Sequence, residues 1–368
     1  MKDNCIVAQS GGPTVAINAS LAGVIDGVKK SNKFTRVYGA IHGIQGVLDN
    51  NFIDLSLMAL SKFPLVNTLE LSPAMYLGSC RYKLPDFEVD SKPYEIIFDR
   101  FEEYQVAAFF YIGGNDSMDT VDKLSKYANK IGSDVKIVGI PKTIDNDLCH
   151  TDHTPGFGSA AKYVASTMLE IAHDTYIYQI PSVVIVEIMG HKVGWLALYA
   201  GIAGGADIIL LPEIPYDIDV VVNAIRSRTK NGKNFTILAV AEGAISKENA
   251  ALTKKELKEK IKKRKHPSVS YELADQIFQK TGIEVRITVP GHTQRGGSPC
   301  PYDRVLSTRL GAEAATLIMK KEYGYMVGII NGKVKKVPLG DVAGKLKMVS
   351  PDDQLIKEAK CIGISFGV

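Results

Sequence analysis

Several features that mark special classes of protein are missing from this sequence. The five cysteines are scattered and never form a C-x-x-C pair, which argues against a disulfide framework or a zinc site. No apolar run approaches the ~18 residues that span a bilayer. The first residues, M-K-D-N, lead into an apolar stretch without a signal-peptide pattern. We therefore expect a soluble, cytoplasmic protein with reduced thiols and no membrane partner.

Excess charge of one sign is also scarce outside a single segment. The net charge is +4, but residues 254–266 carry eight Lys or Arg side chains against Glu256 and Glu259, so this segment contributes +6 and the rest of the chain −2. Glu and Lys at i, i+4 spacing, such as Glu256 and Lys260, are typical of a solvated helix. A nucleic-acid patch is the alternative, and we expect no nucleic-acid partner.

The chain also lacks low-complexity linkers and fixed-period repeats, and what remains is an alternation of strand, glycine turn and helix. Continuous apolar runs between helical stretches favour parallel sheets covered on both faces. At 368 residues the chain exceeds the usual single-core size of roughly 250–300 residues, so two packed lobes are expected. The apolar runs are residues 5–9, 106–112, 135–140, 183–188, 208–211, 235–240 and 285–289.

Residues 141–147 are the most informative stretch. They read Pro-Lys-Thr-Ile-Asp-Asn-Asp and follow the run 135–140 directly. Open parallel sheets bind ligands at the carboxyl ends of their strands, so two carboxylates, a lysine and a hydroxyl would lie where a base, a metal ligand and a phosphate-binding cation are needed. A polar turn with an Asp N-cap explains the same residues about equally well when they are taken alone.

Two glycine-rich turns follow the earlier apolar runs, with Gly11-Gly12 after the first and Gly113-Gly114 after the second. Backbone N–H groups in such turns approach phosphates closely, and the following helix N-terminus adds partial positive charge. Neither turn fits G-x-G-x-x-G or a Walker A loop, and a purely steric use of glycine is about as common. Their occurrence with residues 141–147 on consecutive strands favours a phosphate site.

A second polar group lies at residues 291–299, Gly-His-Thr-Gln-Arg-Gly-Gly-Ser-Pro, and Arg286 comes shortly before it. Arginine engages phosphate oxygens in bidentate fashion, which suits a sugar phosphate. A lone His292 is more often a structural imidazole. Gln294 and Arg295 beside it favour a binding role.

These residues resemble the phosphofructokinase family over nearly the whole chain. Thr143-Ile144-Asp145-Asn146-Asp147 is identical to the family's T-I-D-N-D motif, and residues 113–117 resemble its G-G-D-x-S loop. The order of the motifs along the chain makes coincidence very improbable. The other matching segments are Gly11-Gly12 with Asn18, residues 77–81 (L-G-S-C-R), Met189-Gly190, Pro212-Glu213, residues 241–243 (A-E-G), 291–299 and Asp303-Arg304.

The resemblance implies an α/β protein of two Rossmann-like three-layer lobes with mainly parallel sheets and the active site in the cleft between them. Residues 1–156 and 294–345 would form the phosphoryl-donor lobe. Residues 157–293 and 346–368 would form the sugar-phosphate lobe. A cationic residue matching Arg286 reaches in from a neighbouring subunit in this family, so a homo-oligomer, at least a dimer, is implied.

The resemblance also implies how the site would work. Asp145 would be the general base that takes the proton from the sugar 1-hydroxyl, supported by Asp147. Phosphoryl transfer depends mostly on positioning and charge neutralisation, so Mg²⁺ and cations should dominate the rest of the site. Asp116 would lie near the Mg²⁺, with Asp145 as a second candidate. The donor would be held by Gly11, Gly12, Arg81 and Lys142, and fructose 6-phosphate by Thr143, Met189, Gly190, His191, Glu213, Arg286, His292 and Arg295.

Two positions bear on the phosphoryl donor. ATP-dependent members resemble G-G-D-G-S and P-G-T-I-D-N-D, whereas pyrophosphate-dependent members carry an Asp and a Lys at the two variable positions, as this chain does with Asp116 and Lys142. A carboxylate at 116 would repel a nucleotide α-phosphate, and Lys142 would fill the vacated space and bind pyrophosphate. We therefore expect a reversible pyrophosphate-dependent 6-phosphofructokinase that forms fructose 1,6-bisphosphate and phosphate.

Several residues depart from the family pattern and leave two alternatives open. Asn115 replaces an Asp, His191-Lys192 replaces an expected Arg, and Ser182 stands where many members have a second inter-subunit Arg. Leu21 and Ile25 stand where regulated bacterial members carry effector-binding arginines, so allosteric control by an effector at that site is not expected. The alternatives are an ATP-dependent 6-phosphofructokinase and a catalytically weak paralogue that binds sugar phosphate.

Overall fold

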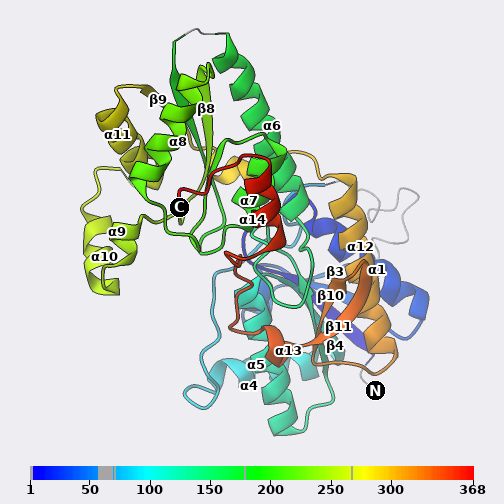
Figure 1. Ribbon diagram of the computed structural model, residues 1–368. Coiled ribbons are helices and arrows are strands. Elements are labelled where there is room, and N and C mark those ends of the chain that lie inside the picture. The colour runs from blue at the N-terminus through cyan, green and yellow to red at the C-terminus, as the bar shows by residue number, and fades with distance from the viewer. Residues whose placement is uncertain (1–2, 57–68, 70–71, 178–179, 267) are drawn as a thin grey trace. The chain divides into compact units, whose positions relative to one another are not determined.

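The computed structural model describes residues 3–56, 69, 72–177, 180–266 and 268–368 (Figure 1). The chain divides into two compact units, Met1–Ser159 with Arg295–Lys347 and Ala160–Gln294 with Met348–Val368. It therefore passes from one unit to the other three times. The sequence places these crossings after residues 156, 293 and 345, and the donor and sugar-phosphate roles of the two units stay a prediction.

The first unit contains a seven-stranded sheet in the order β11-β10-β5-β4-β1-β2-β3. Its β1, β2, β4, β5 and β10 pair in parallel, and antiparallel β3 and β11 form the two edges. The central strands are continuously apolar because both faces are covered. The strands are β1 (Asn4–Gln9), β2 (Arg36–Ala40), β3 (Phe52–Asp54), β4 (Val106–Gly113), β5 (Lys136–Pro141), β10 (Tyr325–Ile330) and β11 (Lys333–Pro338).

Helices cover both faces of this sheet. Val7 and Phe110 pack with residues of α1 and α12 on one face, whereas their neighbours Ile6 and Phe109 pack with residues of α4 and α5 on the other. This alternation follows from the period of two in a strand, and it gives a three-layer α/β/α unit. The helices are α1 (Ile17–Ser31), α2 (Gly43–Leu48), α4 (Lys92–Glu103), α5 (Asn115–Ile131), α12 (Pro301–Met319) and α13 (Leu339–Val342).

The second unit contains a parallel four-stranded sheet in the order β7-β8-β6-β9. Its core includes Val183, Ile185, Leu238 and Val240 from the strands, packed against residues of α8 and α11. The predicted α/β class with mainly parallel sheets is thus confirmed. The elements are α6 (Phe157–Tyr176), β6 (Ser182–Ile188), α7 (Trp195–Ala203), β7 (Ile208–Leu210), α8 (Ile218–Lys230), β8 (Phe235–Ala241), α9 (Lys247–Ala250), α10 (Lys254–Lys262), α11 (Val269–Thr281), β9 (Glu284–Thr288), the 3₁₀ helix η2 (Gly291–Arg295) and α14 (Gln354–Cys361). Within the described residues, no helix is both long and apolar enough to cross a membrane.

The α1–α12 contact depends on glycine. A Cβ on Gly311 would collide with the carbonyl oxygen of Ser20 and come within 2.9 Å of Val24 N. We expect Gly311→Ala to lower the free energy of unfolding by about 1–3 kcal/mol, because the two buried helices must separate. Urea denaturation measures this loss. Gly340→Ala is the matched control, since nothing lies within 4 Å of its added methyl group, and an equal loss in both variants would contradict the prediction.

Candidate active site

The loop after β5 is fixed by short-range hydrogen bonds. The Asp145 backbone N–H donates to Thr143 Oγ1 at 3.1 Å. Asn146 adopts the left-handed conformation with φ 54°, and its buried amide donates to Asp152 O at 3.3 Å. Asn146 thus holds the loop, while Asp145 and Asp147 on either side stay partly exposed. Asn146 has no predicted role of its own, although it belongs to the T-I-D-N-D motif and asparagine tolerates left-handed backbone.

The strand order brings the three predicted loops together at the carboxyl ends of neighbouring strands. β1, β4 and β5 are adjacent and parallel, with Gln9 paired to Ile112 and Gly113 paired to Pro141. The Lys142 backbone N–H donates to Gly113 O at 2.8 Å and extends this pairing into the loop. The two glycine turns predicted to bind phosphate and the candidate catalytic carboxylates therefore lie at the carboxyl ends of neighbouring strands, although Gly11-Gly12 is more than a hundred residues from Asp145 in sequence.

Lys142 lies buried beneath the first glycine turn. Its side chain is only 2% exposed, and its Nζ donates to Gly12 O at 2.6 Å. Burial and, after it, the positive charge of Arg295 lower the pKa of Lys142 to about 7, although Asp145 and Asp147 act in the opposite direction. Two cations held together beside a glycine turn repel each other unless an anion lies between them, so this arrangement favours a phosphate.

The first glycine turn allows this close approach because it has no side chains. Gly11 has φ +81°, and a Cβ there would lie 3.0 Å from Lys142 Nζ. A Cβ on Gly12 would lie 2.7 Å from Arg295 Cζ. Ser79 Oγ donates to Gly11 O at 2.6 Å and ties the L-G-S-C-R segment to the turn. The structure thus brings Arg295 to the predicted donor group, whereas its predicted contact with the sugar phosphate stays a prediction.

Asp116 lies in the first turn of α5, where the helix N-terminus favours a negative charge. Its Oδ1 lies 2.8 Å from Lys83 Nζ, and the two side chains form an ion pair. Both side chains are more than 70% exposed. Lys83 has no predicted role. Its only sequence signal is its position two residues after Arg81.

The structure contains unused oxygen atoms that suit a hard cation. Asn115 Oδ1 and Asp147 Oδ1 are buried and accept no well-formed hydrogen bond among the described residues, although the Asn115 and Thr143 side chains lie near enough to Asp147 to lower its pKa against the effect of burial. Burial raises the pKa of Asp147 above its ordinary value. Mg²⁺ prefers oxygen ligands and keeps several waters, so one or two carboxylates suffice for it. No group of three or more His, Cys, Asp or Glu side chains gathers as a metal cluster in the described part of the chain.

In the second unit, the turn after β6 is held by side chains from distant segments. Met189 N donates to the buried Gln294 Oε1 at 3.1 Å. Gly190 has φ +146°, and the N–H groups of Gly190 and His191 both donate to Glu242 Oε1. The His191 side chain is left exposed. Gln294 and Glu242 thus position the predicted sugar-phosphate turn from behind.

Glu213 has one carboxylate oxygen engaged and one available. Its Oε1 accepts from Gly194 N and from Val349 N, both at 3.0 Å. Its Oε2 is buried without a hydrogen-bond partner among the described residues. An ionised acceptor of this kind suits a sugar hydroxyl, which supplies the missing donor.

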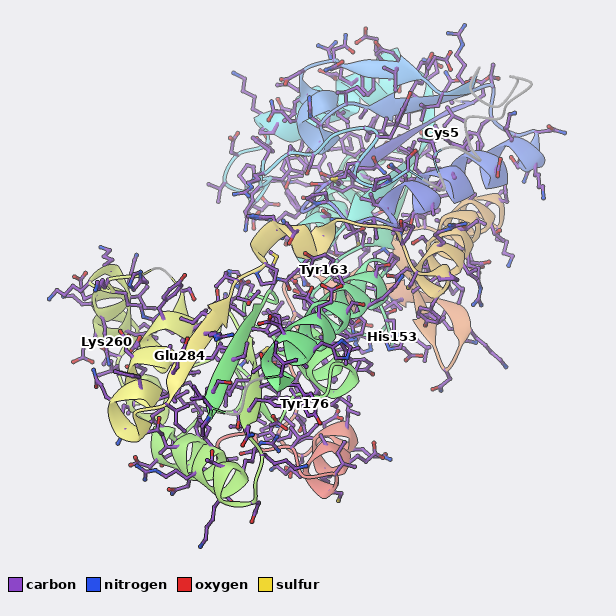
Figure 2. All side chains as sticks on the ribbon, turned by 90° about the horizontal axis from the view of Figure 1, so that it is seen from above. Cys5, His153, Tyr163, Tyr176, Lys260 and Glu284 are labelled. Atoms are coloured by element: carbon purple, nitrogen blue, oxygen red, sulfur yellow. The ribbon has the colours of Figure 1, made fainter. Side chains whose placement is uncertain are left out.

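Arg286 lies apart from these groups. It pairs with Val184 in the register of β6 and β9, five residues before Met189 and therefore about 16 Å from it along the strand. Its guanidinium contacts Asp174 at 3.5 Å and Glu284 at 3.3 Å beside a groove of about 310 Å³. Glu284 is labelled at the start of β9 in Figure 2. Within one chain, the structure does not bring Arg286 to the turn that it is predicted to serve.

His292 lies exposed in η2. Its neighbour Thr293 is anchored, because Tyr163 Oη donates to Thr293 Oγ1 at 2.9 Å. Tyr163 lies on α6 and is labelled in Figure 2. The next two residues, Gln294 and Arg295, are fixed in turn by Met189 and by the Gly12 turn described above.

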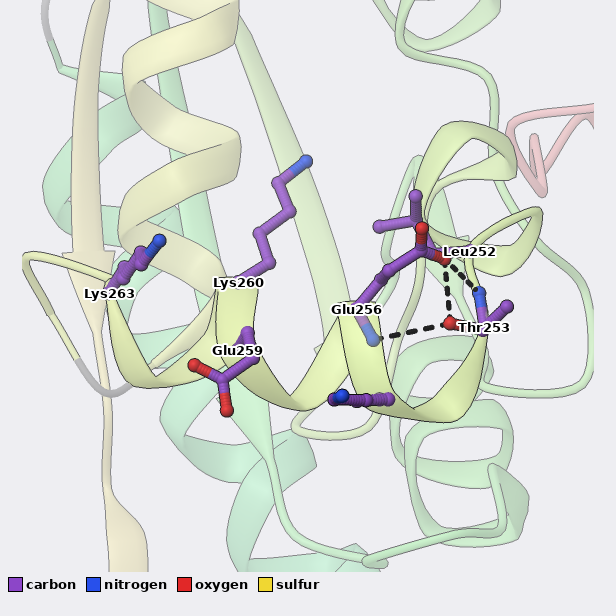
Figure 3. Close-up of a pocket in the computed structure, with 7 residues that line it drawn as sticks. Leu252, Thr253, Glu256, Glu259, Lys260 and Lys263 are labelled. Atoms are coloured by element: carbon purple, nitrogen blue, oxygen red, sulfur yellow. Dashed lines mark hydrogen bonds between the residues drawn. The ribbon is translucent and has the colours of Figure 1, made fainter.

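A second surface groove, of about 670 Å³, lies along the basic helix α10 (Figure 3). Thr253 and Glu256 form a capping box at its N-terminus, and none of its residues is buried. Lys260 Nζ donates to Asn249 Oδ1 at 2.6 Å rather than pairing with Glu256. The groove contains none of the predicted site residues, and the helix has the solvated character expected from its sequence.

Comparisons with known proteins agree with this arrangement. The family model for phosphofructokinase matches residues 4–318. ATP-dependent 6-phosphofructokinases of Spirochaeta thermophila and Propionibacterium freudenreichii are 39% and 34% identical, each over 98% of this chain and over 96% and 98% of those proteins. The crystal structure of a pyrophosphate-dependent phosphofructokinase from Nitrosospira multiformis matches 99% of this chain and 92% of that one, with a TM-score of 0.85 and 29% identity. The chain therefore belongs to the phosphofructokinase family and is a phosphotransferase.

Proposed function

We propose that this phosphofructokinase uses pyrophosphate, with Mg²⁺, to phosphorylate the 1-hydroxyl of fructose 6-phosphate, and that it runs the reaction in both directions. The observation that carries the donor assignment is the buried Lys142, whose ammonium lies under the Gly11-Gly12 turn beside Arg295. A nucleotide needs space beyond its transferred phosphates. Here a lysine side chain takes up space beneath the turn and presents positive charge instead.

The sugar hydroxyl loses its proton to Asp145 as it attacks the donor phosphorus. Asp145 is suited to this role because its loop is fixed by Thr143 and Asn146. Lys142, Arg81 and the Gly11-Gly12 backbone hold the donor and neutralise its charge. Bound Mg²⁺ would neutralise further charge on the phosphates, and the residues that would hold it are Asp116 and Asp145.

Fructose 6-phosphate would be held mainly by the second unit. Glu213 Oε2 accepts a sugar hydroxyl, and the Met189-Gly190 turn supports the sugar and its phosphate together with two exposed histidines, His191 next to the turn and His292 in η2. Arg286 lies about five strand positions from Met189. We therefore propose that it serves the site of a second copy in a homo-oligomer.

An ATP-dependent 6-phosphofructokinase is the second candidate. Curated relatives carry that name, and the ion pair between Lys83 and Asp116 favours it, because it neutralises the carboxylate that would repel a nucleotide. Exposed pairs of this kind contribute only about 0–1 kcal/mol. The buried Lys142 has the larger effect, so pyrophosphate is the better supported donor.

A coupled assay with purified protein, fructose 6-phosphate and Mg²⁺ tests the donor. We expect kcat/KM for pyrophosphate to exceed that for ATP by about 100-fold or more, which corresponds to ~2.7 kcal/mol of transition-state stabilisation. Turnover with ATP but not with pyrophosphate would show that the donor is ATP. Binding of fructose 6-phosphate without turnover on either donor would instead support the catalytically weak paralogue.

A further inference from the structure

The chain passes between the two units for the last time after Lys347. Hydrogen bonds hold Lys347 to the candidate catalytic loop. Lys347 is the final residue of the first unit. Its backbone N–H donates to Asp147 O at 2.8 Å, and its ammonium donates to Thr151 O at 2.8 Å and Asp152 O at 3.1 Å. One residue thus engages three backbone carbonyls of the loop that carries Asp145.

Two residues further along the chain, Val349 is held to Glu213, the candidate ligand of the sugar. Val349 is buried, and its backbone N–H donates to Glu213 Oε1 at 3.0 Å. This bond, with the one from Gly194, occupies one carboxylate oxygen of Glu213 and leaves Oε2 for another donor. Lys347 thus contacts the loop of the candidate base within the first unit, and Val349 contacts the candidate sugar ligand within the second.

The loop needs such support because its backbone is unusual. Asn146 and His150 both adopt positive φ values, 54° and 57°, which costs free energy and exposes carbonyl groups that a regular element would satisfy. A charged donor makes stronger hydrogen bonds than a neutral one. The ammonium of Lys347 thus adds two charged hydrogen bonds to a loop that Thr143 and Asn146 also hold.

We propose that Lys347 is a positioning residue for phosphoryl transfer. It holds the backbone of residues 147–152 so that Asp145 keeps the geometry that proton transfer requires, and residues 347–349 fix Glu213 through Val349. A base displaced by a fraction of an ångström loses rate before substrates lose affinity. The inference rests on the proposed role of Asp145, but not on which donor is used.

Kinetics of three variants test this inference. Lys347→Met keeps the aliphatic stem but removes both ammonium bonds, and we expect kcat to fall about 10- to 100-fold while KM values change less than about threefold. Lys347→Arg should keep kcat within about threefold of wild type, because a guanidinium also donates to carbonyls. Lys345→Met is the matched control. Lys345 is exposed, and its Nζ donates to Gly340 O, which is not part of the loop, so kcat should not change in this variant.

A second readout is independent of turnover. Amide hydrogen exchange across residues 145–152 should speed up in Lys347→Met but not in Lys345→Met, with melting temperatures within about 2 °C of each other. The inference is overturned if Lys347→Met keeps wild-type kcat, if Lys347→Arg loses as much as Lys347→Met, or if exchange rises equally in the Lys345 control. Rates are measured with whichever donor supports turnover, so failure of pyrophosphate alone overturns the proposed donor while this inference is tested with ATP.

Discussion

Replacing Asp145 with asparagine is expected to lower kcat by about 10²–10⁴-fold, the usual contribution of a general base. Asparagine has the same shape and keeps the backbone bond from residue 145 to Thr143 Oγ1, so the loop should stay in place. What it loses is the capacity to accept the hydroxyl proton. Steady-state kcat at saturating substrates measures the effect. Calorimetric affinity for fructose 6-phosphate should stay within about twofold, because Asp145 acts in the transition state.

Asp152→Asn is the control for this experiment. Asp152 lies in the same loop and is exposed, and its carboxylate accepts from Asn331 N at 2.7 Å, so it has a structural rather than a catalytic partner. We expect that variant to keep kcat within about threefold of wild type. If Asp145→Asn retains a tenth or more of the wild-type rate, the base must be another group, and Asp147 is the nearest carboxylate in sequence.

Much of the fold was predictable because its central strands are buried on both faces. The apolar runs 183–188 and 235–240 correspond to β6 (Ser182–Ile188) and β8 (Phe235–Ala241) within one residue. The edge strands gave no such signal. β11 reads Lys-Val-Lys-Lys-Val-Pro and has mostly exposed side chains, so it lacks the apolar run of a central strand. It forms because β10 provides a hydrogen-bonding edge, and strand order of this kind is not encoded in local pattern.

The candidate site also has a part that the sequence predicts and a part that it does not. Motifs that are continuous in sequence, such as residues 143–147, can be recognised from the sequence because their functional groups are close together along the chain. Contacts such as Lys142 with Gly12, Lys83 with Asp116 and Lys347 with the Asp147 backbone join segments 33 to 200 residues apart. No spacing rule predicts such pairs. They depend on which strands are neighbours and on where the chain returns to the first unit.

Replacing Lys142 with methionine is expected to lower kcat/KM for pyrophosphate by about 10²–10³-fold, the usual effect of removing one preorganised donor from a developing anion. Methionine has a similar length and fills the buried space, so the Gly11-Gly12 turn loses the cation without gaining a cavity. Activity with ATP should not fall by the same factor if Lys142 selects the donor. An equal loss with both donors would mean that Lys142 acts in folding rather than in donor choice.

The pH dependence of kcat/KM gives an independent test of the same residue. Burial lowers the pKa of Lys142 to about 7, so the ammonium is present below that pH and is lost as the pH rises through it. Since kcat/KM reports the unliganded enzyme, its value for pyrophosphate should fall above about pH 7. Lys142→Arg stays charged at these pH values, and the ratio of wild type to this variant cancels the titration of pyrophosphate itself. A ratio that does not change between pH 6 and 9 would show that the charge of Lys142 does not control donor capture, and the donor assignment would then lose its main physical support.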